Sequence, residues 1–532
     1  MSAAPRTVGR YVIETLAANG IDTAFGIPGV HNIELYRGLE ARCVRHVLAR
    51  HEQNAAFAAD GFARVTGRPA AAFVISGPGL TNALTAIAQA ASDSVPMLVI
   101  ASTPVRASLG RHWGVLHELA DQRSVAAGVA GLALHASTAQ EVRAALAAAF
   151  AYLGGGRPRP AYVGVPLDLL AETTALEPEG FARVSAAPQP DAASVQAARA
   201  LLEGAQRPLI VAGGGARHAG AALERLVEAL DGYLVTTVAA KGVIPESHPA
   251  NLGASLPYRA TQELLASADV VVAAGTELAE TDVYTTTRLE FAGRLIRIDI
   301  DASQLAEASA QEVALHADAR TALELLTRTV RPRRGWRSAA GEARGPRLAL
   351  EAQIGAHFGP ALAAVRALRA AVPADGVVFS DMTQIAYTGN YAFAANRPGS
   401  WFHPSGYGTL GFALPAAIGA KIAEPRRAVV ALAGDFGVQF TLQELMTAVE
   451  LQLPLPVVVW NNEALAQIRD DMIAAGIEPV GVTGRNPDFQ AFAAACGARA
   501  LRVRGPDALV QGVRAALETR GPTLLEAHVT DF

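Results

Sequence analysis

Hydrophobic positions along the chain follow two alternating patterns. Short runs rich in Val, Ile and Phe end at Gly, Ser or Asp, and longer stretches rich in Ala and Leu separate them. The short runs have the length and composition of buried strands, and the longer ones have helical spacing. This alternation is typical of parallel sheets covered by helices on both faces. The predicted strands lie in TAFGIPG, AAAFVISGPG, VPMLVIAS, RPLIVAGGGA, ADVVVAAGTE, RLIRIDID, DGVVFSD, RAVVALAGD and LPVVVWNN.

Two stretches interrupt the pattern and divide the chain. Residues 175–192 contain three prolines and little periodicity, and residues 328–347 are basic and rich in Gly and Pro. A basic run can bind phosphate or nucleic acid, but a solvated connector is the better prediction in a chain of net charge −4. We therefore predict three doubly wound α/β domains with parallel sheets, over 1–175, 190–330 and 350–532.

Composition limits the partners and the cellular compartment that the sequence predicts. The near-neutral charge gives no reason to expect nucleic acid or an anionic membrane as partner. Cys43 and Cys496 are too few for a disulfide framework and suit a reducing compartment. The first twenty residues lack the continuous apolar core of a signal peptide, and no uncharged apolar run is long enough to span a bilayer. The sequence predicts a cytoplasmic protein.

The first and third predicted domains share an order of features. Residues 76–102 and residues 434–462 each contain a Gly-rich turn, a helical stretch, a proline and a strand, at similar spacing. An old duplication explains this echo, and so does the common plan of any two strand–helix–strand units. The sequence leaves both explanations open.

One strand–helix–strand unit in the last third carries candidate chemistry. Residues 429–433 form a buried-type strand, and Thr441 and Glu444 have the spacing of a capping box that would begin a helix. The helix would bury one apolar face. That face consists of Leu442, Leu445, Met446 and Val449.

The ends of the two strands in this unit carry an acid and an amide. Because the crossover leaves the strands parallel, Asp435 and Asn462 are expected at the same edge of the sheet, where open α/β sheets bind ligands. Carboxylate and amide oxygens suit Mg²⁺ together with a phosphate. Gly434 and Gly437 let the backbone approach such a phosphate. The alternative is that Asp435 and Asn462 only cap turns.

Several longer segments, in order along nearly the whole chain, resemble the thiamine diphosphate enzymes. The spacing from Gly434-Asp435 to Asn461-Asn462 resembles the Gly-Asp-Gly and Asn-Asn signature of that family. The resemblance implies a pyrimidine-binding, a central and a diphosphate-binding domain. The branch is acetolactate synthase-like, and the segments are most similar to 5-guanidino-2-oxopentanoate decarboxylases. The other matching segments are FGIPGVHNIEL, RHEQNAAFAADGFARVTGRPA, SGPGLTNALTAIAQA and PSGYGTLGFALPAAIGA.

The resemblance implies roles toward thiamine diphosphate. Glu52 matches the carboxyl group that bonds N1′ of the cofactor and drives its activation by acid–base chemistry. Leu410 matches the apolar prop under the bent cofactor, and the carbonyl of Gly408 would hold the 4′-amino group. Thr383 and Gln384 match the loop near the diphosphate. For Glu52 the alternative is a solvent-facing glutamate at a helix start. For Leu410 it is an ordinary core leucine, and for Thr383 and Gln384 it is a polar strand end.

The resemblance also implies a magnesium site. Asp435, Asn462 and the backbone carbonyl of Ala464 match its protein ligands. The sequence departs from the family at Phe436, where a glycine is usual, although Gly437 follows one place later. We expect this change to alter the loop without abolishing cofactor binding. The remaining expected cofactor contacts in this region are Gly434, Phe436, Gly437 and Leu465.

The substrate side is less determined. Val30 and His31 follow the GIPG turn and are expected to face the thiazolium. Some decarboxylases of this fold carry a histidine where this chain has Ile75, so His31, His117 or Gln122 would have to move protons instead.

An acidic pair lies just past the predicted metal loop. Asp470 and Asp471 fall where the family builds its substrate wall, and two acids there suit a cationic substrate tail such as guanidinium. The alternative is two exposed helix acids beside Arg469.

These expectations together predict a thiamine diphosphate- and Mg²⁺-dependent decarboxylase of a small 2-oxo acid, with a basic one such as 5-guanidino-2-oxopentanoate as first candidate. The alternatives are an acetolactate synthase-like carboligase and a non-catalytic cofactor-binding regulatory module. The family builds each active site between two chains, so we expect a homodimer or homotetramer. Some relatives bind FAD or ADP in the central domain, but the Gly-x-Gly-x-x-Gly pattern is absent after VAGGGA, and FAD is not predicted.

Overall fold

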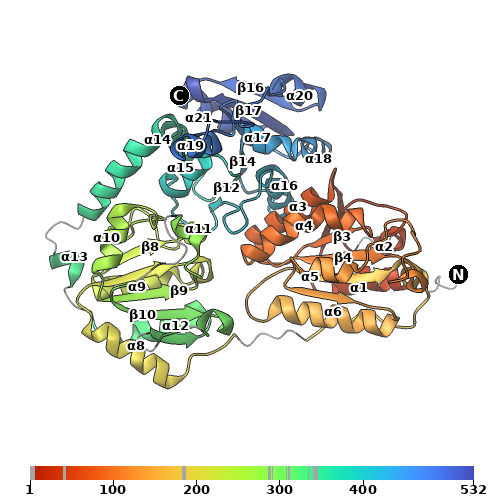
Figure 1. The fold of residues 1–532 in the computed structure, drawn as a ribbon, viewed down its shortest axis with the longest axis horizontal. Coiled ribbons are helices and arrows are strands. Elements are labelled where there is room, and N and C mark those ends of the chain that lie inside the picture. The colour runs from red at the N-terminus through yellow and green to blue at the C-terminus, as the bar shows by residue number, and fades with distance from the viewer. Residues whose placement is uncertain are drawn as a thin grey trace.

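Three α/β domains follow one another along the chain (Figure 1). The structure is a computed structural model, and it describes residues 6–532 apart from 40–42, 183–186, 285–288, 290, 307, 310–311, 333–334 and 340–344. Each domain has one sheet in which all paired strands run parallel. The prediction of three doubly wound domains with parallel sheets is confirmed.

The first sheet has six strands in the order β2-β1-β3-β4-β6-β5. Its central strands are buried along their whole length, as expected for strands with helices on both faces. The strands are β1 (Thr23–Gly26), β2 (Arg45–Leu48), β3 (Ala71–Val74), β4 (Leu98–Thr103), β5 (Leu132–His135) and β6 (Ala161–Pro166). The helices are α1 (Val8–Ala18), α2 (Ile33–Leu39), α3 (Glu52–Thr66), α4 (Pro78–Ser92), α5 (Gln122–Ala127), α6 (Ala139–Gly154) and α7 (Leu167–Ala171).

The central sheet has five strands in the order β11-β10-β9-β7-β8. The strands are β7 (Pro208–Ala212), β8 (Tyr233–Thr236), β9 (Val270–Ala274), β10 (Arg294–Asp299) and β11 (Glu312–His316). The helices are α8 (Ala192–Gly204), α9 (Gly220–Leu230), α10 (Arg259–Ser267), α11 (Glu280–Val283) and α12 (Ala319–Thr329).

The third sheet has six strands in the order β13-β12-β14-β15-β17-β16. The strands are β12 (Val377–Ser380), β13 (Trp401–Phe402), β14 (Val429–Gly434), β15 (Leu455–Asn461), β16 (Arg499–Val503) and β17 (Pro522–His528). The helices are α14 (Gly345–Ala371), α15 (Gln384–Ala392), α16 (Ala413–Ala423), α17 (Asp435–Gln439), α18 (Leu445–Glu450), α19 (Ala466–Ala474), α20 (Phe489–Ala495) and α21 (Gly505–Glu518).

The first and third sheets have the same topology. When their strands are numbered within each domain, both sheets have the order 2-1-3-4-6-5. The echo seen in the sequence therefore extends from one strand–helix–strand unit to a whole six-stranded domain. In each sheet the chain reverses its direction of winding between the first and third strands of the domain. Ligands bind at the carboxyl ends of strands around such a switch point.

The first and third domains share a continuous hydrophobic core. Helices α3 and α16 lie side by side between the two sheets, with α4 next to them (Figure 1). Two glycines allow this close approach. A Cβ on Gly61 would lie 1.9 Å from the carbonyl oxygen of Ala416, and one on Gly419 would lie 1.8 Å from that of Ala58. The two domains are therefore packed as one body along α3.

The second predicted linker differs from expectation. Its middle forms α13 (Trp336–Ala339), which packs on the central domain rather than lying in solvent. Arg337 is 9% exposed and pairs with Asp231 and Glu228 at 3.1 and 2.9 Å. The Trp336 ring meets that of Tyr233 edge to face. The basic charge at Arg337 is thus neutralised by acids of α9 and its C-terminal end.

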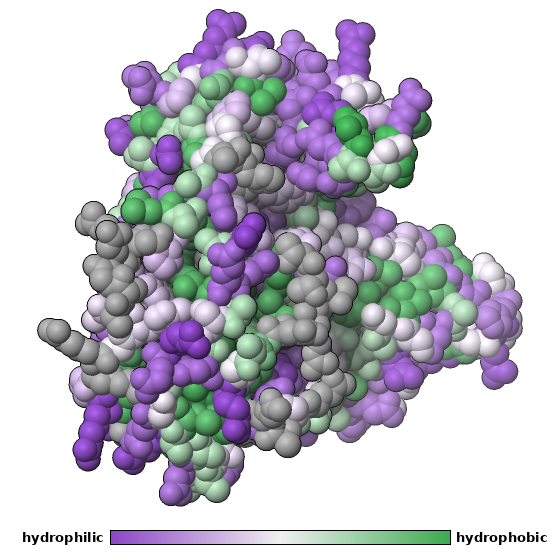
Figure 2. Space-filling model, turned by 60° about the vertical axis from the view of Figure 1, so that its left-hand side comes forward, coloured by the Kyte–Doolittle hydropathy of each residue, from purple (hydrophilic) through white to green (hydrophobic). Residues whose placement is uncertain are grey.

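Hydrophobic and polar residues are interspersed on the face of the molecule shown in Figure 2. In the described part of the chain, no helix has both the length and the hydropathy required to cross a bilayer.

Candidate functional site

The switch point of the third sheet gathers the predicted phosphate and metal residues. β14 ends at Gly434, and Asp435 begins α17 directly after it. Gly434 packs against Thr383, because a Cβ on this glycine would lie 2.7 Å from the Thr383 hydroxyl. Thr383 precedes α15 at the end of neighbouring β12. The structure therefore brings the turn at Asp435 and the turn at Thr383 together.

The helix predicted to begin at Thr441 is organised differently. The chain first forms α17, then a 3₁₀ turn over Leu442–Glu444, and only then α18. The Thr441 hydroxyl donates to the carbonyl of Gly411 at 3.0 Å and makes no cap. Glu444 instead accepts hydrogen bonds from the Arg50 backbone N–H and the Asn54 amide of the first domain. The capping-box prediction was wrong, since both side chains find tertiary partners.

Asp435 is a buried carboxylate with one amide donor. It is 2% exposed, and the Asn486 amide donates to its Oδ2 at 2.7 Å. Burial raises the pKa of Asp435 against the opposing effect of this hydrogen bond. The Asn486 amide also donates to Asn461 Oδ1 at 3.0 Å. Asn486 was missed in the sequence, where it marks only a polar turn before a proline.

The side chain of Asn462 lies at the same edge of the sheet as this carboxylate. Asn462 follows β15, the strand next to β14, and its Oδ1 meets the backbone N–H of Ala464 at 3.3 Å. Its amide donates to Gln384 Oε1 at 3.3 Å. A carboxylate and an amide oxygen at one edge of the sheet are ligand types that suit Mg²⁺. No cluster of three or more His, Cys, Asp or Glu with metal-binding geometry occurs among the described residues.

Phe436, where the family usually has glycine, turns away from the turn at the strand end. A Cβ on Gly484 would lie 3.1 Å from its ring, so Phe436 packs toward Gly484. The backbone at Gly437 packs closely against two side chains, because a Cβ there would lie 3.2 Å from Asp381 and 3.5 Å from Leu410.

Leu410 and Gly408 lie on the loop before α16. Leu410 is half-buried rather than part of the closed core, and Gly408 is exposed with φ 68°. Gly411 donates its N–H to both oxygens of Asp381 at 3.0 and 2.9 Å. The Leu410 side chain thus lies beside Gly437, in the helix that begins at Asp435. Leu465 precedes α19, and its N–H donates to the carbonyl of Val482 at 2.8 Å.

The predicted acidic pair lies on α19. Asp470 is exposed and pairs with Arg469 at 3.0 Å, which agrees with the alternative of exposed helix acids beside Arg469. Its second oxygen also accepts from the Gln384 amide at 3.3 Å, which connects it to Asn462. Asp471 is exposed and accepts from Gln467.

The switch point of the first sheet gathers the remaining predicted residues. His31 follows β1, and its Nδ1 hydrogen-bonds the hydroxyl of Ser76, which follows β3. The rings of His31 and His117 meet edge to face with centroids 4.8 Å apart. Burial first, and then the nearby His117, lower the pKa of His31. The Nδ1 atom of His117 is buried without a hydrogen-bond partner.

Gln122 has no free amide atom at this site. Its Oε1 accepts from the Gly77 N–H at 3.0 Å, and its Nε2 donates to the Ser102 carbonyl and the Tyr162 hydroxyl. Gly77 has φ 61°, and a Cβ there would lie 2.6 Å from the His117 carbonyl. Gln122 therefore fixes the turn that carries Ser76 and supports His117.

Glu52 begins α3 in the first domain. His51 caps the helix by accepting from the Gln53 N–H, and the Asn82 amide of α4 donates to Glu52 Oε2 at 2.9 Å. Glu52 is half-buried, and Val30 is 67% exposed. Within one chain, the shielded pocket expected around Glu52 is only partly built.

The glycine turn of the central domain packs against its neighbour strand. A Cβ on Gly213 would lie 2.3 Å from the Gly275 carbonyl oxygen, and Gly215 approaches the Cα of Gly275 in the same way. Close packing of the loops after β7 and β9 thus accounts for these glycines.

Comparison with known proteins matches each of the three domains to the same enzyme family. Three family models match the chain: the thiamine pyrophosphate enzyme N-terminal TPP binding domain over residues 6–125, the central domain over 195–326 and the C-terminal TPP binding domain over 381–527.

Curated relatives match over most of their lengths. A probable 2-ketoarginine decarboxylase, AruI of Pseudomonas aeruginosa, is 47% identical over 98% of this chain and 93% of its own length. The large subunits of acetolactate synthase isozymes 1 and 3 of Escherichia coli are both 30% identical, over 87% and 98% of this chain and 83% and 94% of their own.

Proposed function

Because the chain belongs to the family of thiamine pyrophosphate enzymes, we propose that it is a thiamine diphosphate- and Mg²⁺-dependent decarboxylase of a basic 2-oxo acid such as 5-guanidino-2-oxopentanoate. The observation that carries this proposal is the 47% identity, over nearly both full lengths, to a probable 2-ketoarginine decarboxylase. When bound, thiamine diphosphate would supply a carbanion that adds to the keto carbon and a thiazolium ring that takes up the electron pair released when CO₂ leaves.

The third domain would hold the metal and the diphosphate. Asp435, Asn462 and the Ala464 carbonyl would coordinate Mg²⁺, whose charge would relieve the cost of burying the Asp435 carboxylate. The backbone at Gly437 and the side chains of Thr383 and Gln384 would contact the diphosphate. Leu410, half-buried beside them, would support the bend of the cofactor.

The first domain would handle protons. Glu52 would share a proton with N1′ of the pyrimidine, and Asn82 orients its carboxylate. His31 would take part in proton transfer to the product carbon, and burial, which lowers the pKa of its imidazole, favours the neutral ring near neutral pH. Ser76 and His117 fix the ring of His31. Gln122, with both amide atoms engaged, would position the Gly77 turn rather than move a proton.

Asp470 and Asp471 would receive the cationic end of the substrate. Asp470 is connected through Gln384 to Asn462, one of the proposed metal ligands. A guanidinium group could replace Arg469 as its partner with two parallel hydrogen bonds. Both acids are exposed in a single chain, and a neighbouring chain would enclose them.

A homodimer or homotetramer would complete the site. Glu52 and Asp435 each bond within their own domain, and the family places such halves against those of a second chain. Apolar side chains are exposed near both halves and would become buried. They include Val30 and Leu116 in the first domain and Ile468, Ile473, Ile477 and Val480 in the third. Sedimentation of the purified protein tests this, and a catalytically active monomer would contradict it.

The decisive test is CO₂ release with thiamine diphosphate and Mg²⁺ over a panel of 2-oxo acids that differ in charge. We expect the basic acids to be preferred and Glu52→Gln to lose activity by about 100-fold or more, in line with the loss of an acid–base group. Glu450→Gln, at an exposed carboxylate, is the matched control. Cofactor binding without CO₂ release from any acid would contradict the proposal.

A carboligase is the second candidate, because two of the relatives are acetolactate synthase subunits. Product analysis with a second carbonyl compound present separates the two activities. An aldehyde identifies the decarboxylase, and a hydroxy ketone or hydroxy oxo acid identifies the carboligase.

A further inference from the structure

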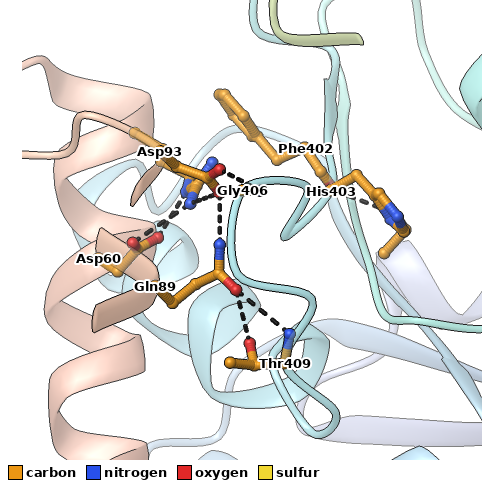
Figure 3. A network of polar contacts seen from close by, with 9 residues as sticks. Asp60, Gln89, Asp93, Phe402, His403, Gly406 and Thr409 are labelled. Atoms are coloured by element: carbon orange, nitrogen blue, oxygen red, sulfur yellow. Dashed lines mark hydrogen bonds and ion pairs between the residues drawn. The ribbon is translucent and has the colours of Figure 1, made fainter. Parts of the chain in front are cut away.

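The loop over residues 404–411 is held from the first domain as well as from its own. Asp93 Oδ1 accepts from the Gly406 N–H at 2.8 Å. Gln89 Oε1 accepts from both the N–H and the hydroxyl of Thr409, at 3.3 and 2.9 Å. Figure 3 shows Gln89 and Asp93 reaching this loop from the helix side of the interface. Two side chains of α4 or its C-terminal end thus fix the backbone on both sides of Gly408.

Gln89 and Asp93 are themselves held in place by a buried ion-pair array. The Gln89 amide donates to Asp93 Oδ2 at 2.8 Å, and Arg64 pairs with the same oxygen at 2.7 Å and with Asp60 at 2.5 Å. The side chains of Arg64 and Asp60 are 8% and 0% exposed. The Arg64 guanidinium also lies over the ring of Phe412 at 5.0 Å. Groups buried in this way lose much free energy if one partner is removed, so the array is rigid.

The far end of the loop is fixed from the third domain. Asp381 accepts from the Gly411 N–H, and the Gly411 carbonyl accepts from Thr441. Gly408 and Leu410 lie between these two anchoring points. Among the described residues, neither Gly408 nor Leu410 makes a hydrogen bond to the first domain. Their positions therefore follow from the backbone around them.

We propose that Gln89 and Asp93 are positioning residues for the thiamine cofactor, which act through the backbone of residues 406–409 to set the Gly408 carbonyl and the Leu410 side chain. This inference rests on the proposed function. A carbonyl that must meet an amino group, and a side chain that must support a bent ligand, are useful only within a fraction of an ångström. The array spans the interface between domains, so the α3–α4 packing of the first domain determines the cofactor loop of the third.

Gln89→Met tests the inference. Methionine keeps the size of the side chain but removes the acceptor for Thr409 and the donor to Asp93. Amide hydrogen exchange of the cofactor-free protein reads the loop directly, because the Thr409 N–H is one of the bonded groups. We expect exchange at residues 406–409 to be at least about 10-fold faster. We also expect a dissociation constant for thiamine diphosphate about 10-fold higher, with KM for the oxo acid unchanged.

Two further variants make the test specific. Gln140→Met, at an exposed position on α6, is the matched control and should change neither quantity. Thr409→Val removes the hydroxyl that donates to Gln89 Oε1. Because both substitutions remove this hydrogen bond, the effects of Gln89→Met and Thr409→Val should be less than additive in the double variant.

Unchanged exchange at residues 406–409, or additive effects in the double variant, would overturn the inference. So would a uniform rise in exchange over α3, α4 and the loop with cofactor affinity intact, since that result is a loss of general stability. Failure of the wild-type protein to bind thiamine diphosphate would overturn the proposed function instead. In that case the exchange rates would still decide whether Gln89 holds the loop.

Discussion

The carboxylate of Glu444 in the third domain accepts a hydrogen bond of 2.6 Å from the backbone N–H of Arg50 in the first. It also accepts from the amide of Asn54 at 3.0 Å, and it is 2% exposed. The two donors flank Glu52 in the sequence. The start of α3, and with it the Glu52 carboxylate, is therefore held by a side chain that follows the turn at Asp435.

Replacing Glu444 by alanine should destabilise the protein by about 1–3 kcal/mol, because it leaves two buried donors without an acceptor. Chemical unfolding followed by fluorescence measures this loss. Glu450→Ala is the matched control, since Glu450 also pairs with Arg50 but through the guanidinium, and its side chain is 51% exposed. We expect the control to lose at most about 0.5–1 kcal/mol. Equal losses in the two variants would show that the Arg50 N–H does not depend on Glu444.

Asp381 should make stability depend on pH. It is fully buried, and burial raises its pKa to about 7. In the unfolded chain the group titrates near about 4, so the folded state binds more protons between those values and its stability falls as pH rises through this window. In Asp381→Asn this contribution is absent. Urea midpoints measured from pH 4.5 to 7.5 should therefore favour the variant increasingly at higher pH, and parallel curves would refute the assignment.

Gly61→Ala tests the close contact of α3 with α16. The added Cβ would lie 1.9 Å from the Ala416 carbonyl oxygen, so the two helices must separate. We expect a loss of about 2–3 kcal/mol from this overpacking. Gly204→Ala is the control, because Gly204 ends α8 with open space around it, and alanine should be neutral or stabilising there. A Gly61→Ala protein as stable as the wild type would contradict the contact.

Under the proposed function, Asn486→Ala should weaken Mg²⁺ binding. The Asn486 amide orients Asp435 and joins it to Asn461, so its loss frees the carboxylate to rotate. Partners that orient ligands are typically worth about 10–100-fold in metal affinity. Calorimetry with Mg²⁺ and thiamine diphosphate measures the change. Gln206→Ala, which removes a hydrogen bond to the Gly204 carbonyl in the central domain, should leave the affinity within about 2-fold. Equal affinity in Asn486→Ala and the wild type would remove Asn486 from the site.

The amino-acid sequence determined the parts of this protein that depend on local chemistry. Hydrophobic period and turn residues gave the nine predicted strands, and parallel crossovers placed Asp435 and Asn462 at one edge. These features are local because the length, burial and end of a strand are determined by the residues that form it.

The tertiary structure decided which polar groups meet across long stretches of chain. Thr441 and Glu444 have a capping pattern, but their hydrogen bonds go to Gly411 and to the start of α3. Asn486 reaches Asp435 from 51 residues away, and no spacing rule joins the two. The physical reason is that a buried hydrogen bond forms with whichever partner packing brings within reach. Packing depends on the whole fold rather than on the neighbouring sequence.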